Sequence, residues 1–131
     1  MSITAPRAAP RVAIAVVHSR VFADPPHLLA VPLTGFSLVG ASAPFATEPA
    51  FEDRTGHGTA TAAAIVWSGP PVALTIVRIL DDELRTTSMA LAEAIRQAAE
   101  AGARVINLSV GSTRPEARDL LAAAVSDARE L

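Results

Sequence analysis

Residues 53–65 read DRTGHGTATAAAI, and this stretch decides which fold the chain adopts. His57 lies between two glycines, which allow the backbone to approach a neighbouring segment closely. We expect a helix from about Gly58 to Trp67, because Gly69 and the two prolines after it cannot continue one. Trp67 is expected to anchor the end of this helix by packing. A histidine presented at the start of a helix is a candidate general base.

Apolar runs of strand length alternate with helical patterns along the rest of the chain. Because this alternation requires crossover connections, the strands should pair in parallel, and the predicted fold class is α/β with flanking helices. Functional residues of such sheets gather at the carboxyl ends of the strands. The expected strands are Val12–Val17, Phe36–Val39, Val72–Leu80 and Val105–Val110, and the further helices are Ser88–Ala101 and one opened by the capping box Thr113–Glu116.

The last two helices each have an apolar face. In the first of them, Leu91, Ile95 and Ala98 recur at helical spacing, and Gly102 suits the position just beyond the helix end. In the second, the residues expected on one side are Leu120 or Leu121, Ala124 and Ala128.

The composition predicts one domain, residues 11–131, preceded by a flexible arm, residues 1–10. A net charge of −2 and an aromatic content of 4% argue against nucleic-acid and anionic-membrane partners. The absence of cysteine excludes disulfides and thiolate chemistry. The longest early apolar run, Val12–Val17, is too short for a membrane span. We therefore expect a cytoplasmic protein without a cofactor.

Two segments together carry a family resemblance. Residues 53–65 match the pattern D-x-x-G-H-G-T-x-x-A-x-x-I, and residues 101–111, AGARVINLSVG, resemble A-x-V-I-N-x-S-L-G. Both patterns, in this order, resemble the subtilisin-like serine proteases (subtilases, peptidase family S8). The resemblance runs from about Arg11 to the last residue and implies a truncated subtilisin-like three-layer fold. In that family the catalytic triad follows the order Asp, His, Ser, and the histidine position carries over to His57.

The other two members of the triad do not carry over. The family's first strand ends in V-x-V-I-D-S-G-I, whereas the run Val12–Val17 is followed by His18, which stands at the aspartate position. The family's serine lies in a G-T-S-x-A-x-P motif well beyond the N-L-S segment, and the sequence resembles only the front half of the fold. Since the carboxylate orients the imidazole and stabilises its charged form, we expect the free-standing chain to be an inactive pseudoprotease.

Ser109, Val110 and Gly111 are the expected substrate-binding residues. In the family the matching stretch pairs its backbone with an extended peptide, so the resemblance implies binding by strand addition. The leading hypothesis is therefore an inactive accessory partner that binds a peptide or a protein. A plain strand end that leads into a helix cap is the alternative for these three residues.

Other interpretations stay open. The chain could be one subunit of a split serine protease whose serine comes from another polypeptide. His18 and His57 could form a metal site if Asp53 or His27 joined them, although no spacing fixes a third ligand. The acidic run Asp81–Glu83 is expected to be a solvated loop.

The strand Val105–Val110 has no sequence-identified neighbour on one side. Left bare, an apolar edge strand is a site for pairing with another chain. We expect a homodimer or a heteromer formed through this edge.

Overall fold

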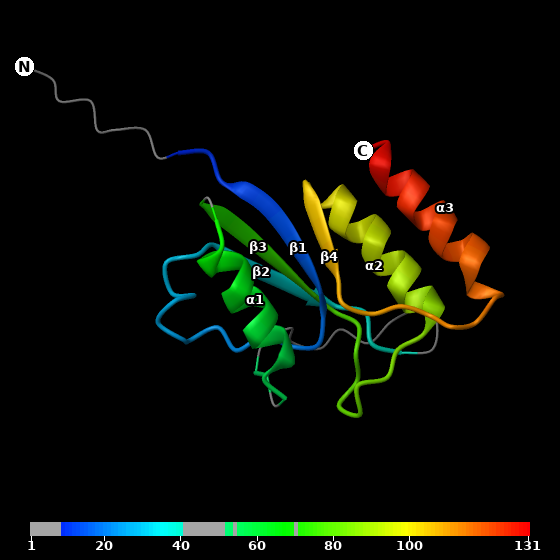
Figure 1. Cartoon of the computed structure of the whole chain (residues 1–131), viewed down its shortest axis with the longest axis horizontal. Helices are drawn as coiled ribbons and strands as arrows, with labels where there is room; N and C mark the ends of the chain where they lie inside the picture. The colour runs from blue at the N-terminus through cyan, green and yellow to red at the C-terminus, as the bar shows by residue number, and fades with distance from the viewer. Residues whose placement is uncertain (1–8, 41–51, 54, 70) are drawn as a thin grey trace, which may run out of the picture.

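The chain folds as a four-stranded sheet with helices packed against it (Figure 1). The computed structural model describes residues 9–40, 52, 53, 55–69 and 71–131. The strand order is β2-β3-β1-β4, and each of these pairings is parallel. The predicted α/β class is thus confirmed. The strands are β1 (Val12–His18), β2 (Leu33–Ser37), β3 (Val72–Arg78) and β4 (Val105–Leu108), and the helices are α1 (His57–Trp67), α2 (Ser88–Glu100) and α3 (Ala117–Arg129).

The two central strands, β1 and β3, are apolar on both faces. In β1, Val16 packs in the cluster that includes α1, whereas Ala15 and Val17 pack in the cluster that includes α2. In β3, Ile76 and Val77 divide between the same two clusters. Continuous apolar runs are typical of strands buried on both sides in a parallel sheet. Helix, sheet and helix therefore form the three layers that the family resemblance implies.

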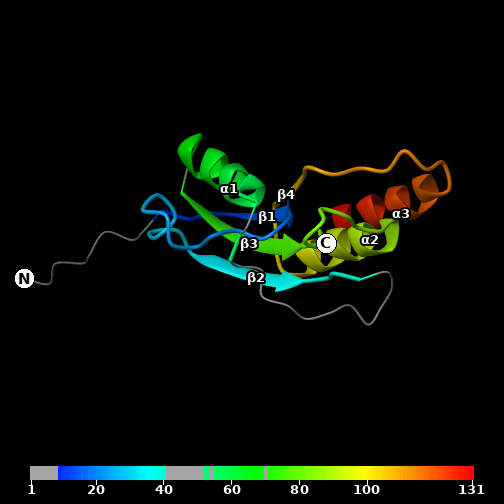
Figure 2. The same ribbon diagram turned by 90° about the horizontal axis from the view of Figure 1, so that it is seen from below.

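The helices on the two faces differ in number. Figure 2 shows α1 standing apart from α2 and α3, which lie side by side. Ala124 of α3 is buried, and the expected face of this helix packs against the α2 side of the core. On the outer side, Nε of Arg96 lies 3.1 Å from Oδ2 of Asp127, which links α2 to α3. On this face, α2 packs against the sheet and α3 packs against α2.

Helix α2 has the start and the apolar face that the sequence predicts, and it ends at Glu100, one residue before the expected Ala101. Leu91, Ile95 and Ala98 are buried. The Thr87 side chain caps the start by accepting a hydrogen bond from the amide of Ala90 at 3.1 Å. Gly102 follows the helix with φ of 89°, a backbone conformation that suits glycine.

The predicted capping box at the start of α3 is wrong. The helix begins at Ala117 with Glu116 as its N-cap, and no side chain caps it. Thr113 lies too far ahead of the first turn to act as a cap. Instead, the Ser112 hydroxyl accepts a hydrogen bond from the amide of Arg114 at 3.2 Å, which shapes the turn before the helix. The capping-box spacing is present, but Pro115 and Glu116 form a turn rather than the helix.

All four strands differ from the sequence prediction at one end or at both. β1 ends at His18, one residue beyond the expected Val12–Val17. β2 spans Leu33–Ser37 rather than 36–39, because these residues pair with β3. β3 ends at Arg78, since the amide of Ile79 turns to the carbonyl of His18, at 3.0 Å. β4 ends at Leu108, whose partner Val17 is the last paired residue of β1 on that side.

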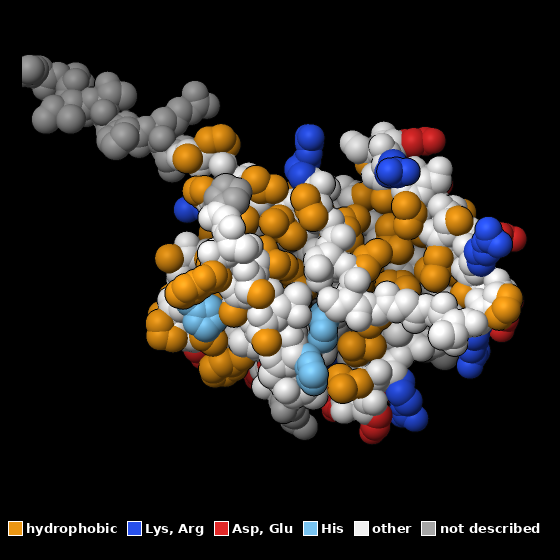
Figure 3. Space-filling model, viewed as in Figure 1, with side chains coloured by type: hydrophobic (Ala, Val, Ile, Leu, Met, Phe, Trp, Pro, Cys, Tyr) orange, Lys and Arg blue, Asp and Glu red, His pale blue; other side chains and the backbone are white. Residues whose placement is uncertain are grey.

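Trp67 is not the packing anchor that the sequence suggests. Its side chain is 91% exposed. Hydrophobic side chains are spread over the face seen in Figure 3, while the arginines and carboxylates lie mainly around its rim. Among the described residues, no helix combines the length and hydrophobicity that a membrane span requires. Most of the expected arm, residues 1–8, lies outside the described residues.

Candidate functional site

His57 is the first residue of α1, and its side chain is exposed. The residue before it, Gly56, serves as the N-cap with φ of 79°, a left-handed conformation that glycine adopts without strain. β1 and β3 are parallel, so their carboxyl ends lie at the same end of the sheet. His57 lies at this end, beside His18, the last residue of β1. The predicted general base is therefore held at the edge where functional residues of such sheets gather.

The start of α1 is held by Asp53, four residues before the helix. Its Oδ2 accepts hydrogen bonds from the amide and the hydroxyl of Thr59, at 3.1 and 2.6 Å. Its Oδ1 accepts from the amide of Thr55 at 3.0 Å. Burial raises the pKa of Asp53, but the Thr59 hydroxyl and the amides of Thr55, Thr59 and Gly56 outweigh it, so the pKa lies below its ordinary value. Asp53 is a charged cap for the helix that carries His57.

Gly58 allows α1 to approach the segment that follows β1. A Cβ atom at this position would collide with the carbonyl oxygen of Arg20 and would lie 3.0 Å from Oγ of Ser19. No larger residue fits without displacing the helix from the end of β1. The second glycine of the histidine motif thus brings His57 close to β1.

His18 lies at the end of β1, and its ring stacks on that of His57. The two ring centroids are 6.4 Å apart and the rings are 16° from parallel. Nδ1 of His18 accepts a hydrogen bond from the amide of Ser19 at 2.7 Å, which places the proton of the neutral ring on Nε2. The two histidines therefore meet as a ring stack.

The environment of His18 favours its neutral form. Burial and, next, the neighbouring His57 lower the pKa of His18 below 6.5, while Asp53 opposes this shift. A charged His18 would repel an imidazolium at His57. The position at which the family has a carboxylate therefore holds a neutral ring at neutral pH.

The described residues offer no third ligand for a metal at this pair. Asp53 is occupied by the capping hydrogen bonds. His27 lies elsewhere, in a hollow lined by Ala63, Ala64 and Trp67 near the other end of α1. Within the described ranges, no group of three His, Cys, Asp or Glu residues could hold a metal ion. The metal hypothesis gains no support from the geometry.

Ser109, Val110 and Gly111 follow β4 at the same edge of the sheet as His18. Leu108 pairs with Val17, so Ser109 comes level with His18. The Ser109 hydroxyl lies 3.1 Å from Oδ1 of Asn107. Within the described part of the chain, the amides of Val110 and Gly111 donate no hydrogen bond to another backbone group. Their backbone is thus available to a ligand.

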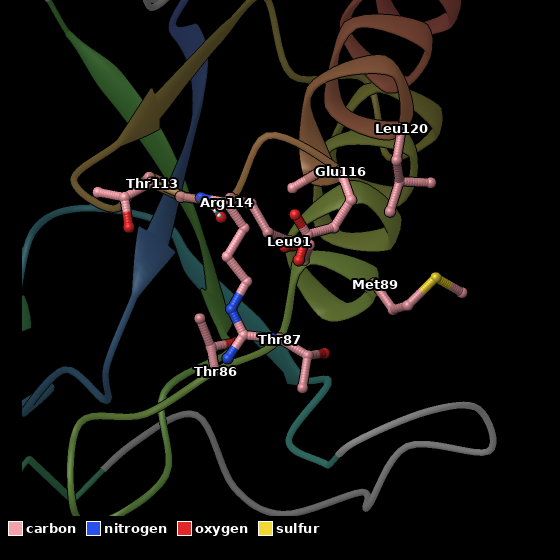
Figure 4. A pocket seen from close by; sticks show the side chains of 12 residues that line it. Thr86, Thr87, Met89, Leu91, Thr113, Arg114, Glu116 and Leu120 are labelled. Atoms are coloured by element: carbon pink, nitrogen blue, oxygen red, sulfur yellow. Dashed lines mark hydrogen bonds between the residues drawn. The ribbon is translucent and has the colours of Figure 1, made fainter.

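Gly111 also borders a hollow of about 560 Å³ between the first turns of α2 and α3. Figure 4 shows the side chain of Arg114 extending toward Thr86 and Thr87 at one side of this hollow. Leu91 and Leu120 give it an apolar wall, and the remaining lining residues are Ser88, Met89, Ser112, Thr113, Glu116 and Ala117. Sequence reasoning did not identify this hollow, since its wall comes from two segments, 86–91 and 111–120, that lie apart in the chain.

The acidic run Asp81–Glu83 is more than a solvated loop. Asp81 accepts a hydrogen bond from the amide of Arg85 at 2.7 Å and closes the turn. Oδ1 of Asp82 lies 3.3 Å from Nη2 of Arg78 and 3.5 Å from Nη2 of Arg20. Arg78 is only 2% exposed, so the Asp82 contact compensates a charge buried at the end of β3. An arginine at the end of an apolar strand was the available sequence signal.

Comparison with known proteins agrees with this architecture. Residues 39–130 match the sequence pattern of the subtilase family, Peptidase_S8. No protein among the curated sequences matches the chain. Three solved structures are similar: a lanthipeptide protease (30% identity, TM-score 0.73), the S218A mutant of the protease domain of PatA (27%, 0.66) and the nisin leader peptidase NisP from Lactococcus lactis (24%, 0.72).

The likeness covers most of this chain but less than half of those proteins. It includes 91%, 91% and 90% of this chain and 36%, 46% and 40% of the respective structures. The fold, the histidine motif at the start of α1 and the family pattern over residues 39–130 agree with one another. The chain therefore belongs to the subtilase family.

Proposed function

We propose that this chain is a non-hydrolytic member of the subtilase family that binds an extended peptide. The observation that carries the proposal is the stack of His18 on His57, with ring centroids 6.4 Å apart. A triad carboxylate holds the histidine in the correct tautomer and stabilises the imidazolium that forms during catalysis. A neutral ring at that position supplies no negative charge, and a protonated one would oppose the charge on His57.

The peptide-binding part of the proposal rests on the segment after β4. The amides of Val110 and Gly111 are available for main-chain hydrogen bonds, which give an added strand its affinity. A peptide that runs along this segment passes the hollow beside Gly111, where one of its side chains can enter between Leu91 and Leu120. Alternate side chains of an added strand reach such pockets and provide specificity.

The bound peptide is proposed to be a precursor peptide that undergoes maturation. Among the similar structures, the 30% identical one is a lanthipeptide protease, and another, at 25% identity, is the prenylagaramide maturation protease PagA. These titles describe those proteins. By analogy, the ligand of this chain is a linear peptide of the same kind, bound without being cut.

The test uses fluorescence anisotropy with labelled linear peptides from lanthipeptide and prenylagaramide precursors. We expect at least one to bind, and Gly111→Val to abolish binding by placing a branched side chain on the backbone along which the peptide would run. A Cβ at Gly111 meets nothing within 4 Å, so the variant should fold normally. Gly69→Val is the matched control, because Gly69 is equally open but lies at the far end of α1. Binding that survives Gly111→Val, or binding by none of the peptides, would refute the proposal.

A second candidate is the histidine-bearing subunit of a split serine protease. The setting of His57 favours it, since the Asp53–Thr59 cap and the close approach at Gly58 hold the histidine at the edge of the sheet. A serine-directed fluorophosphonate probe separates the two functions. Labelling of a mixture with a serine-bearing polypeptide, lost in His57→Ala, would establish the split protease. Labelling that does not depend on His57 would argue against it.

A further inference from the structure

Both rings of the histidine pair keep hydrogen-bond donors that no described residue uses. Nδ1 of His18 accepts from the amide of Ser19, so the proton on Nε2 is left as a donor. The backbone carbonyl of His57 accepts from the Thr61 hydroxyl, but neither ring nitrogen of His57 has a partner among the described residues. The pair can therefore donate a hydrogen bond from each ring to a ligand.

The acidic group that acts on this pair is bound to other residues. The carboxylate of Asp53 accepts hydrogen bonds from Thr55 and Thr59. In the part of the chain that the structure describes, no carboxylate forms an ion pair with either histidine ring. Within those residues, the ring donors have no anionic partner.

A negatively charged ligand would change the electrostatics of the pair. The ring centroids are 6.4 Å apart, and two imidazolium rings at this separation repel each other. Burial and, next, His57 lower the pKa of His18, while Asp53 raises it. An anion that accepts from both rings offsets the repulsion and favours the protonated form of His18. A carboxylate, with two acceptor oxygens and one negative charge, suits two donors of this kind.

The histidine pair lies close to the segment that is proposed to bind a peptide. Ser109 comes level with His18, because Leu108 pairs with Val17. Gly111 follows Ser109 by two residues, which is at most about 7 Å of extended chain. A peptide that pairs with the backbone at Gly111 therefore has residues within reach of the pair.

We propose that His18 and His57 together bind a carboxylate of the peptide, either its free C-terminus or the side chain of an Asp or Glu residue. This inference rests on the proposed function and names the group that the peptide presents to the pair. A carboxylate in place of His18, as the family has, would repel such a ligand. The exchange of an acidic for a basic residue thus changes the sign of the charge that this end of the sheet recognises.

The first test compares peptides that differ in one carboxylate. The labelled precursor peptides are made with Asn and Gln in place of Asp and Glu, in three versions: a free C-terminus, a C-terminal amide, and the amide with one Glu restored. At about pH 6, we expect one of the two acidic versions to bind about tenfold more tightly than the plain amide, because a charge-assisted hydrogen bond forms. The version that is preferred identifies the source of the carboxylate. Equal affinity of all three versions would overturn the proposal.

The preference for the acidic version should decrease as the pH rises from about 6 to 8, because His18 loses its proton. The titratable groups that act on the pKa of His18 are His57 and Asp53. Asp53 stays charged throughout this range, since hydrogen bonds hold its pKa below 3.8. A preference that does not change with pH would contradict protonated histidine as the partner.

Two matched variants assign the preference to the pair. His18→Asp places the family's residue at the end of β1 and should abolish the preference for the acidic version. His27→Asp makes the same substitution at an exposed histidine near the other end of α1 and should retain it. An equal preference in the two variants would count against the pair.

Sodium acetate separates this inference from the peptide site. The chain has three histidines, so His27 is an internal control in ¹³C NMR of labelled histidine. Acetate should move the ring signals of His18 and His57 but not those of His27, and sodium chloride at the same ionic strength should move none of them. If no peptide binds, the proposed function fails and the acetate titration alone decides. Equal shifts at all three histidines, or no shifts, would then refute a carboxylate site.

Discussion

The helices on the two faces of the sheet are buried to different degrees. On one face, α2 buries seven of its residues, and α3 packs over it with the Arg96–Asp127 contact at the outside. On the other face, α1 buries two residues and leaves Trp67 in solvent. Both helices lie on the same central strands, β1 and β3. The difference therefore lies in what covers each helix.

This contrast separates stability from recognition. The α2–α3 face has an amphipathic pattern, with apolar residues inward and charged residues outward, which suits a helix against solvent. The α1 face carries the histidine pair and the exposed apolar residues. We infer that the α2–α3 face stabilises the chain and that the α1 face is available for binding.

The largest expected effect tests this division directly. Ile95→Ala on α2 should lower the free energy of unfolding by about 2 to 5 kcal/mol, because Ile95 is 3% exposed and its loss leaves a cavity. Trp67→Ala on α1 removes a larger side chain but should change stability by only about 0.5 kcal/mol or less. Urea denaturation followed by circular dichroism measures both. If Trp67→Ala lowered the free energy of unfolding as much as Ile95→Ala does, the two faces would contribute equally to stability and the division between them would be wrong.

The next effect concerns the close contact between α1 and the segment that follows β1. Gly58→Ala should lower the free energy of unfolding by about 1 to 3 kcal/mol, because the added Cβ collides with the carbonyl of Arg20. Alanine is otherwise the better helix former, so a clash must outweigh that preference. Gly69→Ala, where the new atom meets nothing within 4 Å, is the control and should be neutral or stabilising. Equal stability of the two variants would show that α1 does not approach β1 closely.

The smallest effect is a pH dependence confined to the α1 face. The pKa of His18 is lowered from 6.5 in the folded state, so the unfolded chain binds more protons. This contribution to stability is complete above about pH 6.5 and is lost as the pH falls through the lowered folded value. Stability should therefore rise with pH below about pH 6.5 and level off above it.

His18→Asn is expected to flatten that rise, since the amide does not titrate. Thermal unfolding at several pH values measures it. The pKa of Asp53 is also lowered, by hydrogen bonds that outweigh the effect of burial, but its contribution is lost at more acidic pH, below the ordinary range of a carboxyl group. An unchanged pH profile in His18→Asn would contradict a titrating ring at this position.

Local patterns predicted most of the elements of this fold. The apolar run Val12–Val17 and the periodic face of Leu91 and Ile95 have the lengths and spacings of a buried strand and an amphipathic helix. The prediction failed where one pattern allowed two structures. Thr113 has the spacing of a helix cap, but Pro115 and Glu116 form a turn and α3 begins only at Ala117.

The candidate site was predictable only in part. His57 and its glycines form a contiguous motif, and the place of His18 at the end of the first strand followed from the family resemblance. The capping role of Asp53 was missed, although its spacing to Thr59 lies within the same motif. Nothing in the chain order indicated that Asp82 would meet both Arg78 and Arg20.

The sequence by itself determined the order of the elements, the parallel α/β class and the position of His57, because apolar periodicity and glycine placement act over a few neighbouring residues. Only the tertiary structure decided that His18 stacks on His57, that Arg78 is buried and that Trp67 and the edge of β4 face solvent. These features depend on which distant segments meet, and therefore on how much apolar surface each element finds to pack against.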